Sequence, residues 1–141
     1  MEATLKPELL GLDHVVLRVR DLKTMANFYC DVLGCTLDRW REDLGLVHLR
    51  AGDAFIDLAD IDKARQRRGA SGEPEQSGAP NMDHLCLTVA NFDAAVLNEH
   101  LSAHGLTPGE AVTRYGATGD RLSLYLTDPE GNAVELRAAE A

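Results

Sequence analysis

Four residues with metal-ligand chemistry occur at matching places in two halves of the chain. His14 lies in the segment DHVVLRV (13–19), and His84 lies in the similar segment DHLCLTV (83–89). Two carboxylates follow the same scheme, with Asp57 in GDAFIDL and Glu135 in GNAVEL. Imidazole nitrogens and carboxylate oxygens together suit a borderline or hard divalent ion. The four residues are therefore candidate ligands of nickel, zinc, manganese or iron(II).

The two halves repeat one order of elements, which predicts an internal duplication. Each half reads as a strand, a helix that ends at a glycine, and three further strands. The fold class that follows is α+β, one domain of two tandem βαβββ modules forming a curved sheet with a cleft. The modules span about 10–60 and 81–138, and 62–80 is rich in Gly, Pro, Ser and charge, which indicates a linker or flexible lid. The expected strands are 13–19, 35–42, 45–51, 54–59, 83–89, 110–114, 121–127 and 132–138, and the expected helices are 22–33 and 92–104.

Alternation along the strands sorts their side chains onto two faces. The apolar residues of 13–19 point toward the helix, so His14 points to the opposite face, and His84 has the same phase. The apolar neighbours of Asp57 and Glu135 also pack under the helix, which turns both carboxylates away from it. A single inward histidine would be an ordinary polar group in a half-buried sheet. Four potential ligands in one phase at repeat-equivalent positions instead predict a metal site in a cleft between the halves.

Further polar residues share this phase. Tyr125 is a candidate catalytic residue, and His48, which repeats its position, is a candidate acid or base, with a place at the rim as its alternative. Arg18, Arg121 and Arg137 are also in phase, and guanidinium groups there could bind a carboxylate or phosphonate in bidentate fashion. The alternative is that these arginines lie at strand ends and reach solvent. Arg18 and Arg121 are the predicted substrate-binding pair, for a small anionic molecule.

Other potential ligands are assigned to packing. His100 and His104 lie four residues apart on one helix, the spacing of a helical metal pair. Their phase puts them on the side of the helix that packs against the sheet, so a structural role is expected. Cys30, Cys35 and Cys86 form no CxxC pair, and three is an odd number, which disfavours a disulfide framework or a thiolate zinc site.

Composition limits the partners and the compartment. The 141 residues carry a formal net charge of −9, and such a surface repels nucleic acid. No apolar run approaches the roughly 20 residues that span a bilayer, and the N-terminal residues lack the pattern of a secretory signal. We therefore expect a cytoplasmic protein that binds neither nucleic acid nor membrane.

Four motifs resemble the vicinal-oxygen-chelate superfamily of glyoxalases, bleomycin-resistance proteins and extradiol dioxygenases. They are DHVVLRV, FYCDVLG, DHLCLTV and LYLTDPEGNAVEL, and the resemblance covers about 11–138. The stretch VTRYGATGDRLSLYLTDPEGN is similar to a glyoxalase-like, virulence-associated branch. The resemblance implies that His14, His84 and Glu135 bind the metal, and Asp57 stands where glyoxalase I has a fourth, longer carboxylate ligand. It also implies a homodimer whose site can combine residues of two subunits. The sequence does not decide whether one site is built from one chain or from two.

The resemblance implies three classes of function. The first is a metal-dependent lyase or isomerase whose substrate chelates the ion through two oxygens and passes through an enediolate, with Glu135 as general base. If Asp57 does not bind the metal, the remaining triad suits a dioxygenase or a fosfomycin-type thiol transferase. Tyr125 stands where extradiol dioxygenases have a catalytic tyrosine, but 113–124 lacks the histidine that they require. The third class is a ligand-sequestering protein of the bleomycin-resistance type, which lacks these ligands.

Overall fold

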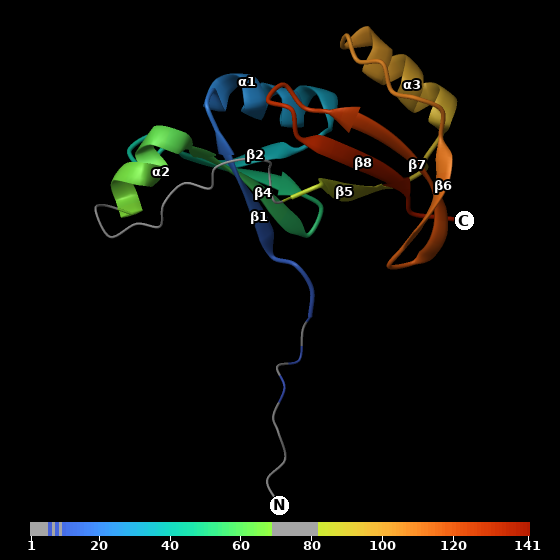
Figure 1. The fold of residues 1–141 in the computed structure, drawn as a ribbon, viewed down its shortest axis with the longest axis horizontal. Coiled ribbons are helices and arrows are strands. Elements are labelled where there is room, and N and C mark those ends of the chain that lie inside the picture. Colours follow the sequence, from blue (N-terminus) through green and yellow to red (C-terminus); the bar gives the residue numbers. More distant parts are fainter. Residues whose placement is uncertain (1–5, 7, 9, 69–81) are drawn as a thin grey trace, which may run out of the picture.

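The structure is a computed structural model that describes residues 6, 8, 10–68 and 82–141. Each half of the chain forms one four-stranded mixed sheet (Figure 1). The first sheet has the order β1-β4-β3-β2 and the second β5-β8-β7-β6, so the predicted α+β class is confirmed. In both sheets the first and last strands of the half are parallel, and the other pairs are antiparallel. The strands are β1 His14–Val19, β2 Thr36–Arg41, β3 Leu46–Ala51, β4 Ala54–Asp60, β5 His84–Val89, β6 Val112–Gly116, β7 Gly119–Thr127 and β8 Ala133–Ala138.

The helix predicted at 22–33 consists of two consecutive parts. It begins as the α-helix α1, Leu22–Asn27, and continues as the π-helix η1, Phe28–Val32. Asp21 caps the start, because its side chain accepts a hydrogen bond from the Thr24 N–H at 3.0 Å. Gly34 ends the helix with a positive φ of 85°, a conformation that glycine adopts without strain.

Two further helices accompany the sheets. Helix α3, Ala94–Ala103, is capped by Asp93 and belongs to the second half. Helix α2, Ile61–Arg68, occupies the start of the segment expected to be a linker or lid. The remainder of that segment, 69–81, lies outside the described residues. In the part of the chain that the structure describes, the helices are too short and too polar to cross a bilayer.

The helix-bearing sides of the two sheets share one hydrophobic core. Helices α1 and α3 lie on the same side of the strands in the view of Figure 1, and buried residues from both halves form a single cluster. The opposite face of each sheet, here called the open face, points away from this core. Val16 on the open face of β1, for example, is 48% exposed. The cluster includes Leu17, Val19, Met25, Tyr29, Leu58, Leu101, Leu126, Val134 and Leu136.

Polar contacts also fix the two halves against each other at the turn between β7 and β8. The buried Tyr29 hydroxyl donates to Asp128 Oδ2 at 2.7 Å. The Glu130 carboxylate accepts the backbone N–H groups of Arg20 and Asp21. The turn itself is closed by the Gly131 N–H, which donates to the Asp128 carbonyl at 3.0 Å.

The buried hydroxyl of Tyr29 is expected to stabilise the fold measurably. Tyr29→Phe keeps the ring but removes a donor from a carboxylate that is only 4% exposed. A hydrogen bond to a charged group contributes about 1.5–3 kcal/mol, so the free energy of unfolding should fall by about that amount in urea denaturation. Tyr115→Phe is the matched control, because Tyr115 is 84% exposed, and it should change stability by less than about 0.5 kcal/mol. Equal stabilities of the two variants would contradict this assignment.

Candidate metal centre

The first predicted pair of ligands lies on the open face of the first sheet. His14 stands at the start of β1, and Asp57 stands on the adjacent strand β4, opposite Val16. Asp57 is 5% exposed, and its Oδ2 is 4.0 Å from His14 Nε2. Its other oxygen, Oδ1, is 2.9 Å from Nδ1 of His48, which faces Asp57 across the β3–β4 ladder. His48 therefore holds the carboxylate and leaves one oxygen toward His14.

The second pair repeats this arrangement on the second sheet with a closer contact. His84 Nε2 is 3.1 Å from Glu135 Oε1, and Glu135 is 5% exposed. Tyr125, opposite Glu135 across the β7–β8 ladder, donates its hydroxyl to Oε1 at 3.0 Å. Ser123 donates to Oε2 at 2.7 Å. Tyr125 and His48 thus occupy repeat-equivalent positions, as the alternation predicted.

These donors control the charge of Glu135. Burial by itself would raise the pKa of this carboxyl, but the hydrogen bonds from Ser123 and Tyr125, together with the nearby His84, outweigh it. The net effect is a pKa below the usual value. Burial and the bond to Glu135 raise the pKa of Tyr125, so this phenol stays protonated and remains a donor at neutral pH. Glu135 is consequently a carboxylate that can accept a proton or bind a cation.

Each histidine is oriented by the aspartate that precedes it, a role that the sequence analysis missed. His14 Nδ1 lies 2.7 Å from Asp13 Oδ1, and His84 Nδ1 lies 2.7 Å from Asp83 Oδ2. An ionised carboxylate can only accept, so Nδ1 of each ring carries the proton and Nε2 is directed toward the buried carboxylate. Metal-binding histidines are commonly held in this way. The repeated Asp-His dipeptide was the signal that could have revealed it.

The spacing of donor atoms fits a divalent ion better in the second pair than in the first. Two ligands that each sit about 2.1 Å from one ion at right angles are about 3 Å apart. The His84–Glu135 separation of 3.1 Å matches this spacing, whereas the His14–Asp57 separation of 4.0 Å is wider. The shorter Asp57 side chain and its bond to His48 account for the difference.

The two pairs do not combine into one centre within a single chain. In the described residues of one chain, no three His, Cys, Asp or Glu side chains are grouped so that they could hold an ion. The shared core joins the helix-bearing faces, so both ligand pairs lie on faces that point away from it. The cleft between the halves, where the ligands were expected to meet, is not formed by these residues of one chain.

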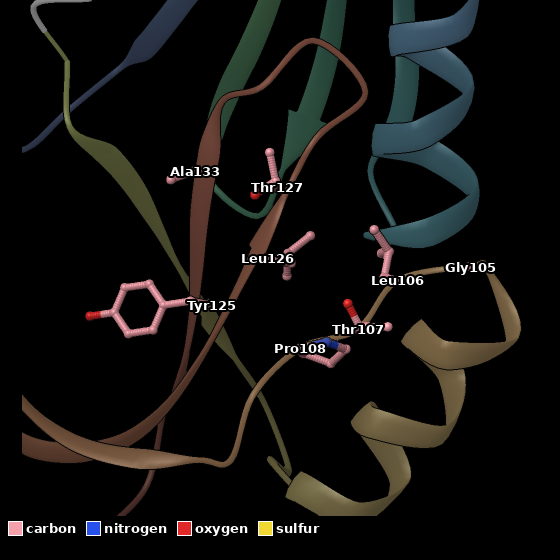
Figure 2. Close-up of a pocket in the computed structure, with 8 residues that line it drawn as sticks. All are labelled: Gly105, Leu106, Thr107, Pro108, Tyr125, Leu126, Thr127 and Ala133. Atoms are coloured by element: carbon pink, nitrogen blue, oxygen red, sulfur yellow. The ribbon is translucent and has the colours of Figure 1, made fainter.

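A cavity near Tyr125 lies on the wrong side of the sheet to serve these ligands. It has a volume of about 300 Å³ and is bounded by 105–108 and by residues of β7 and β8. Figure 2 shows that the Tyr125 ring projects to the opposite side of β7 from Leu126, which faces the loop at 105–108. The Tyr125 side chain therefore lies on the open face, and the side chain of its neighbour Leu126 packs in the core.

The arginines predicted to face the cleft have different environments. Arg18 is exposed on the open face of β1. The Arg121 guanidinium is partly buried, and its Nη1 donates to the Asp120 carbonyl at 2.9 Å. Arg137 is buried rather than solvent-reaching, with Nη2 donating to the Gly119 carbonyl at 2.7 Å. Arg137 therefore supports the β6–β7 hairpin, a role that neither of the two alternatives from the sequence described.

Side chains assigned to packing lie mostly away from the ligand pairs. His100 and His104 are on α3, where His100 Nε2 donates to the Val32 carbonyl at 2.8 Å and links α3 to η1. Cys35 is buried in the core. Cys86 differs from the expectation, because it is exposed on the open face of β5 opposite Glu135. Burial and the Glu135 charge raise the pKa of the Cys86 thiol to about 11.

Comparison with known proteins identifies the family. A model described as the Glyoxalase/Bleomycin resistance protein/Dioxygenase superfamily matches residues 11–136, which contain all four predicted ligands. The chain belongs to this superfamily. The resemblance inferred from the four motifs is thereby confirmed. Proteins of the glyoxalase superfamily include lyases, isomerases and dioxygenases, typically use a divalent metal, bind small molecules and often form dimers.

Relatives of this glyoxalase-superfamily chain match it over nearly its whole length. Virulence protein STM3117 of Salmonella typhimurium is 30% identical over 127 residues, covering 89% of this chain and 81% of that protein. YaeR of Escherichia coli is 30% identical over 140 residues, covering 91% and 98%. The solved structure of VPC_CASS1, from the mobile metagenome of V. pseudocholerae, has a TM-score of 0.74 at 27% identity and covers 97% of this chain and 100% of that one.

Other matches to this superfamily member carry named activities. Mouse methylmalonyl-CoA epimerase is 29% identical over 91% of this chain and 72% of that protein. Biphenyl-2,3-diol 1,2-dioxygenase 2 of Rhodococcus globerulus is 32% identical over 88% of this chain, which spans 60% of that enzyme. Lactoylglutathione lyase of Agrobacterium tumefaciens matches with a TM-score of 0.68 at 23% identity, covering 95% and 96%, a likeness of fold alone.

Proposed function

We propose that this protein is a metal-dependent lyase or isomerase of the glyoxalase type, whose metal centre is shared between two copies of the chain. One copy supplies His14 and Asp57, and the other supplies His84 and Glu135. The observation that carries the proposal is the pairing on each open face of an oriented imidazole with a buried carboxylate. Two such pairs together give the mixed nitrogen and oxygen donor set of a divalent ion.

The location of the pairs supports a site between copies. Each pair lies beside an edge strand, because β1 is bonded only to β4 and β5 only to β8 within the sheets. An edge strand presents unpaired backbone groups on which a second chain can dock. The open faces also carry partly exposed apolar side chains such as Val16. A symmetric dimer that places β1 of one copy near β5 of the other would form two equal sites.

The side chains divide the chemistry between binding and proton transfer. A bound divalent ion would act as a Lewis acid toward two adjacent oxygens of the substrate. Glu135, an ionised carboxylate in a buried setting, removes a proton from the carbon that bears one of these oxygens, and the electron pair of that C–H bond moves toward the adjacent carbonyl. Glu135 then returns the proton to the former carbonyl carbon, which completes the isomerisation. Tyr125 and Ser123 keep the carboxylate oriented for both steps through their hydrogen bonds. The overall reaction needs no redox partner.

His48 is proposed to act through Asp57. Its Nδ1 contacts one oxygen of that carboxylate, so it fixes the angle at which the other oxygen faces His14. His48 is only partly buried and can also exchange a proton with a substrate bound on the open face. Arg18, exposed on the same face, is available to an anionic group of the substrate.

The 4.0 Å separation of His14 and Asp57 favours a second candidate function. If Asp57 stays with His48 and does not bind the ion, His14, His84 and Glu135 leave open positions, as in non-haem iron oxygenases. Iron binding with oxygen consumption on catechols would support this candidate. Turnover of a glutathione hemithioacetal with nickel or zinc would support the lyase.

Metal stoichiometry tests the proposal directly. Protein stripped with a chelator and incubated separately with nickel, zinc, manganese and iron(II) should retain about one ion per chain of at least one metal, because a symmetric dimer has two equal sites. His84→Ala should weaken binding more than the roughly 10–100-fold that follows loss of a hydrogen-bond partner of a ligand. Elemental analysis after gel filtration measures both.

His104→Ala is the matched control for this measurement. His104 is an exposed histidine at the C-terminal cap of α3, and its Nδ1 lies 3.0 Å from the His100 carbonyl oxygen. The control variant should retain the wild-type metal content. Wild-type protein that keeps none of the four metals would contradict the proposal and would instead indicate a ligand-sequestering protein.

A further inference from the structure

The open face of the second sheet concentrates positive charge in an acidic protein. The chain has 23 acidic and 14 basic residues. Within β5 to β8, however, the register puts one acidic residue, Glu135, on this face, beside Arg114, Arg121 and Arg137. Glu135 is already engaged by Ser123, Tyr125 and His84. The arginines therefore have no carboxylate partner among the described residues.

The backbone positions of Arg114 and Arg121 are paired across β6 and β7 in spite of the like charges of their side chains. They stand directly opposite one another on β6 and β7, where like charges are destabilising. Nε of Arg121 is buried and has no hydrogen-bond partner within the described part of the chain. An unsatisfied buried donor destabilises the fold, and more so when the group is charged. A negatively charged ligand would relieve both unfavourable effects.

Arg137 fixes the positions of these two residues. Its guanidinium donates to the carbonyls of Gly119 and Arg114 and to the Thr118 hydroxyl, so it spans both strands of the β6–β7 hairpin. It fills the space beside Gly116, where an added Cβ would clash with the Arg137 guanidinium. With its donors directed to backbone oxygens, Arg137 supports the hairpin and adds positive charge beneath it.

The arginine pair lies close enough to the second ligand pair to serve one substrate. Arg114 Cζ is 5.9 Å from the centre of the Tyr125 ring, and the Tyr125 hydroxyl contacts Glu135. Arg121 is four residues from Tyr125 on the same strand, which corresponds to about 13 Å. An anionic group bound by the arginines would therefore lie several bonds from the atoms that react at Glu135.

From this geometry we infer that Arg114 and Arg121 form an oxyanion subsite, which takes a carboxylate or phosphate group carried by the substrate away from its chelating oxygens. The anion first contacts the exposed part of the Arg121 guanidinium. Rotation of the side chain then brings Nε within hydrogen-bond distance of the anion. Such a planar fork can bind two oxygens of one group. The inference rests on the proposed function, because it assigns the far end of the substrate of that site.

Anion binding to the metal-free protein tests the subsite without requiring turnover. Inorganic phosphate and succinate are titrated separately at low ionic strength, and binding is followed by NMR shifts of the amides in β6 and β7. Saturable binding is expected, with Arg121→Ala and Arg114→Ala each weakening it at least about tenfold, as loss of hydrogen bonds to a charged group implies. Tighter binding of phosphate identifies a phosphorylated substrate, and tighter binding of succinate a carboxylic acid.

Two control variants separate this subsite from non-specific charge effects and from the metal site. Arg20→Ala removes an exposed arginine that directly follows β1, in the other half of the chain, and should leave the titrations unchanged. His84→Ala should lose metal and still bind the anion, so failure of the metal site and failure of the subsite give different results. Absence of saturable binding of both anions, or equal weakening by Arg20→Ala and Arg121→Ala, would overturn the inference.

Discussion

A heterodimer of His14→Ala and His84→Ala chains should bind about one ion, although a dimer of either variant alone should bind none. In a dimer of one variant, every site lacks one ligand. In the heterodimer, one site receives both damaged halves, whereas the other receives His84 and Glu135 from the first chain and His14 and Asp57 from the second. Co-expression with two different affinity tags isolates the heterodimer, and elemental analysis counts its metal. The result would show that the two ligand pairs meet across subunits.

Variants of the same ligand pair provide the control for this experiment. A heterodimer of His84→Ala and Glu135→Ala chains has damage in both of its sites, because the two residues lie in one pair. It should therefore remain without metal. Rescue in this control, or a heterodimer of His14→Ala and His84→Ala chains that stays empty, would be inconsistent with a shared centre.

Glu135→Gln should lower turnover by about 10²–10⁴-fold, the usual contribution of a general acid–base group. The amide keeps the shape of the side chain: its oxygen can accept one of the Ser123 and Tyr125 hydroxyls, and its NH2 can donate to the oxygen of the other. It cannot take up a proton at neutral pH. The rate is measured on a glutathione hemithioacetal with nickel or zinc, next to the metal content of the same sample. Measuring both separates loss of the base from loss of the ion.

Glu110→Gln makes the same chemical change at an exposed position in the loop before β6. It should leave turnover at the wild-type level. Tyr125→Phe removes one of the two hydroxyls on Glu135, so it should lower turnover less than Glu135→Gln does. If Glu135→Gln kept its metal and more than about a tenth of its activity, another residue would have to be the base.

The local features of the site could be predicted because a strand has a two-residue period. That period put His14, His84, Asp57 and Glu135 opposite the apolar residues that pack under the helices, and the structure shows the same phase. The duplication also predicted the equivalence of His48 and Tyr125, each of which faces the carboxylate of its own half.

Other features depend on contacts between strands that the sequence pattern does not contain. Arg137 has the same phase as Arg121, yet it is buried under the β6–β7 hairpin. Arg114 became a candidate only when the register placed it opposite Arg121. The distance between Asp57 and His14 could not be predicted from the sequence pattern either. It depends on His48, which holds one oxygen of the Asp57 carboxylate.

The sequence by itself determined which residues share a face, because alternation and duplication are local properties of the chain. Only the tertiary structure decided where those faces lie relative to each other. Burial of the apolar sides of both sheets in one core turns the two ligand-bearing faces outward. The histidine–carboxylate pairs of one chain consequently lie on separate faces, and the proposed function requires a second chain to bring them together.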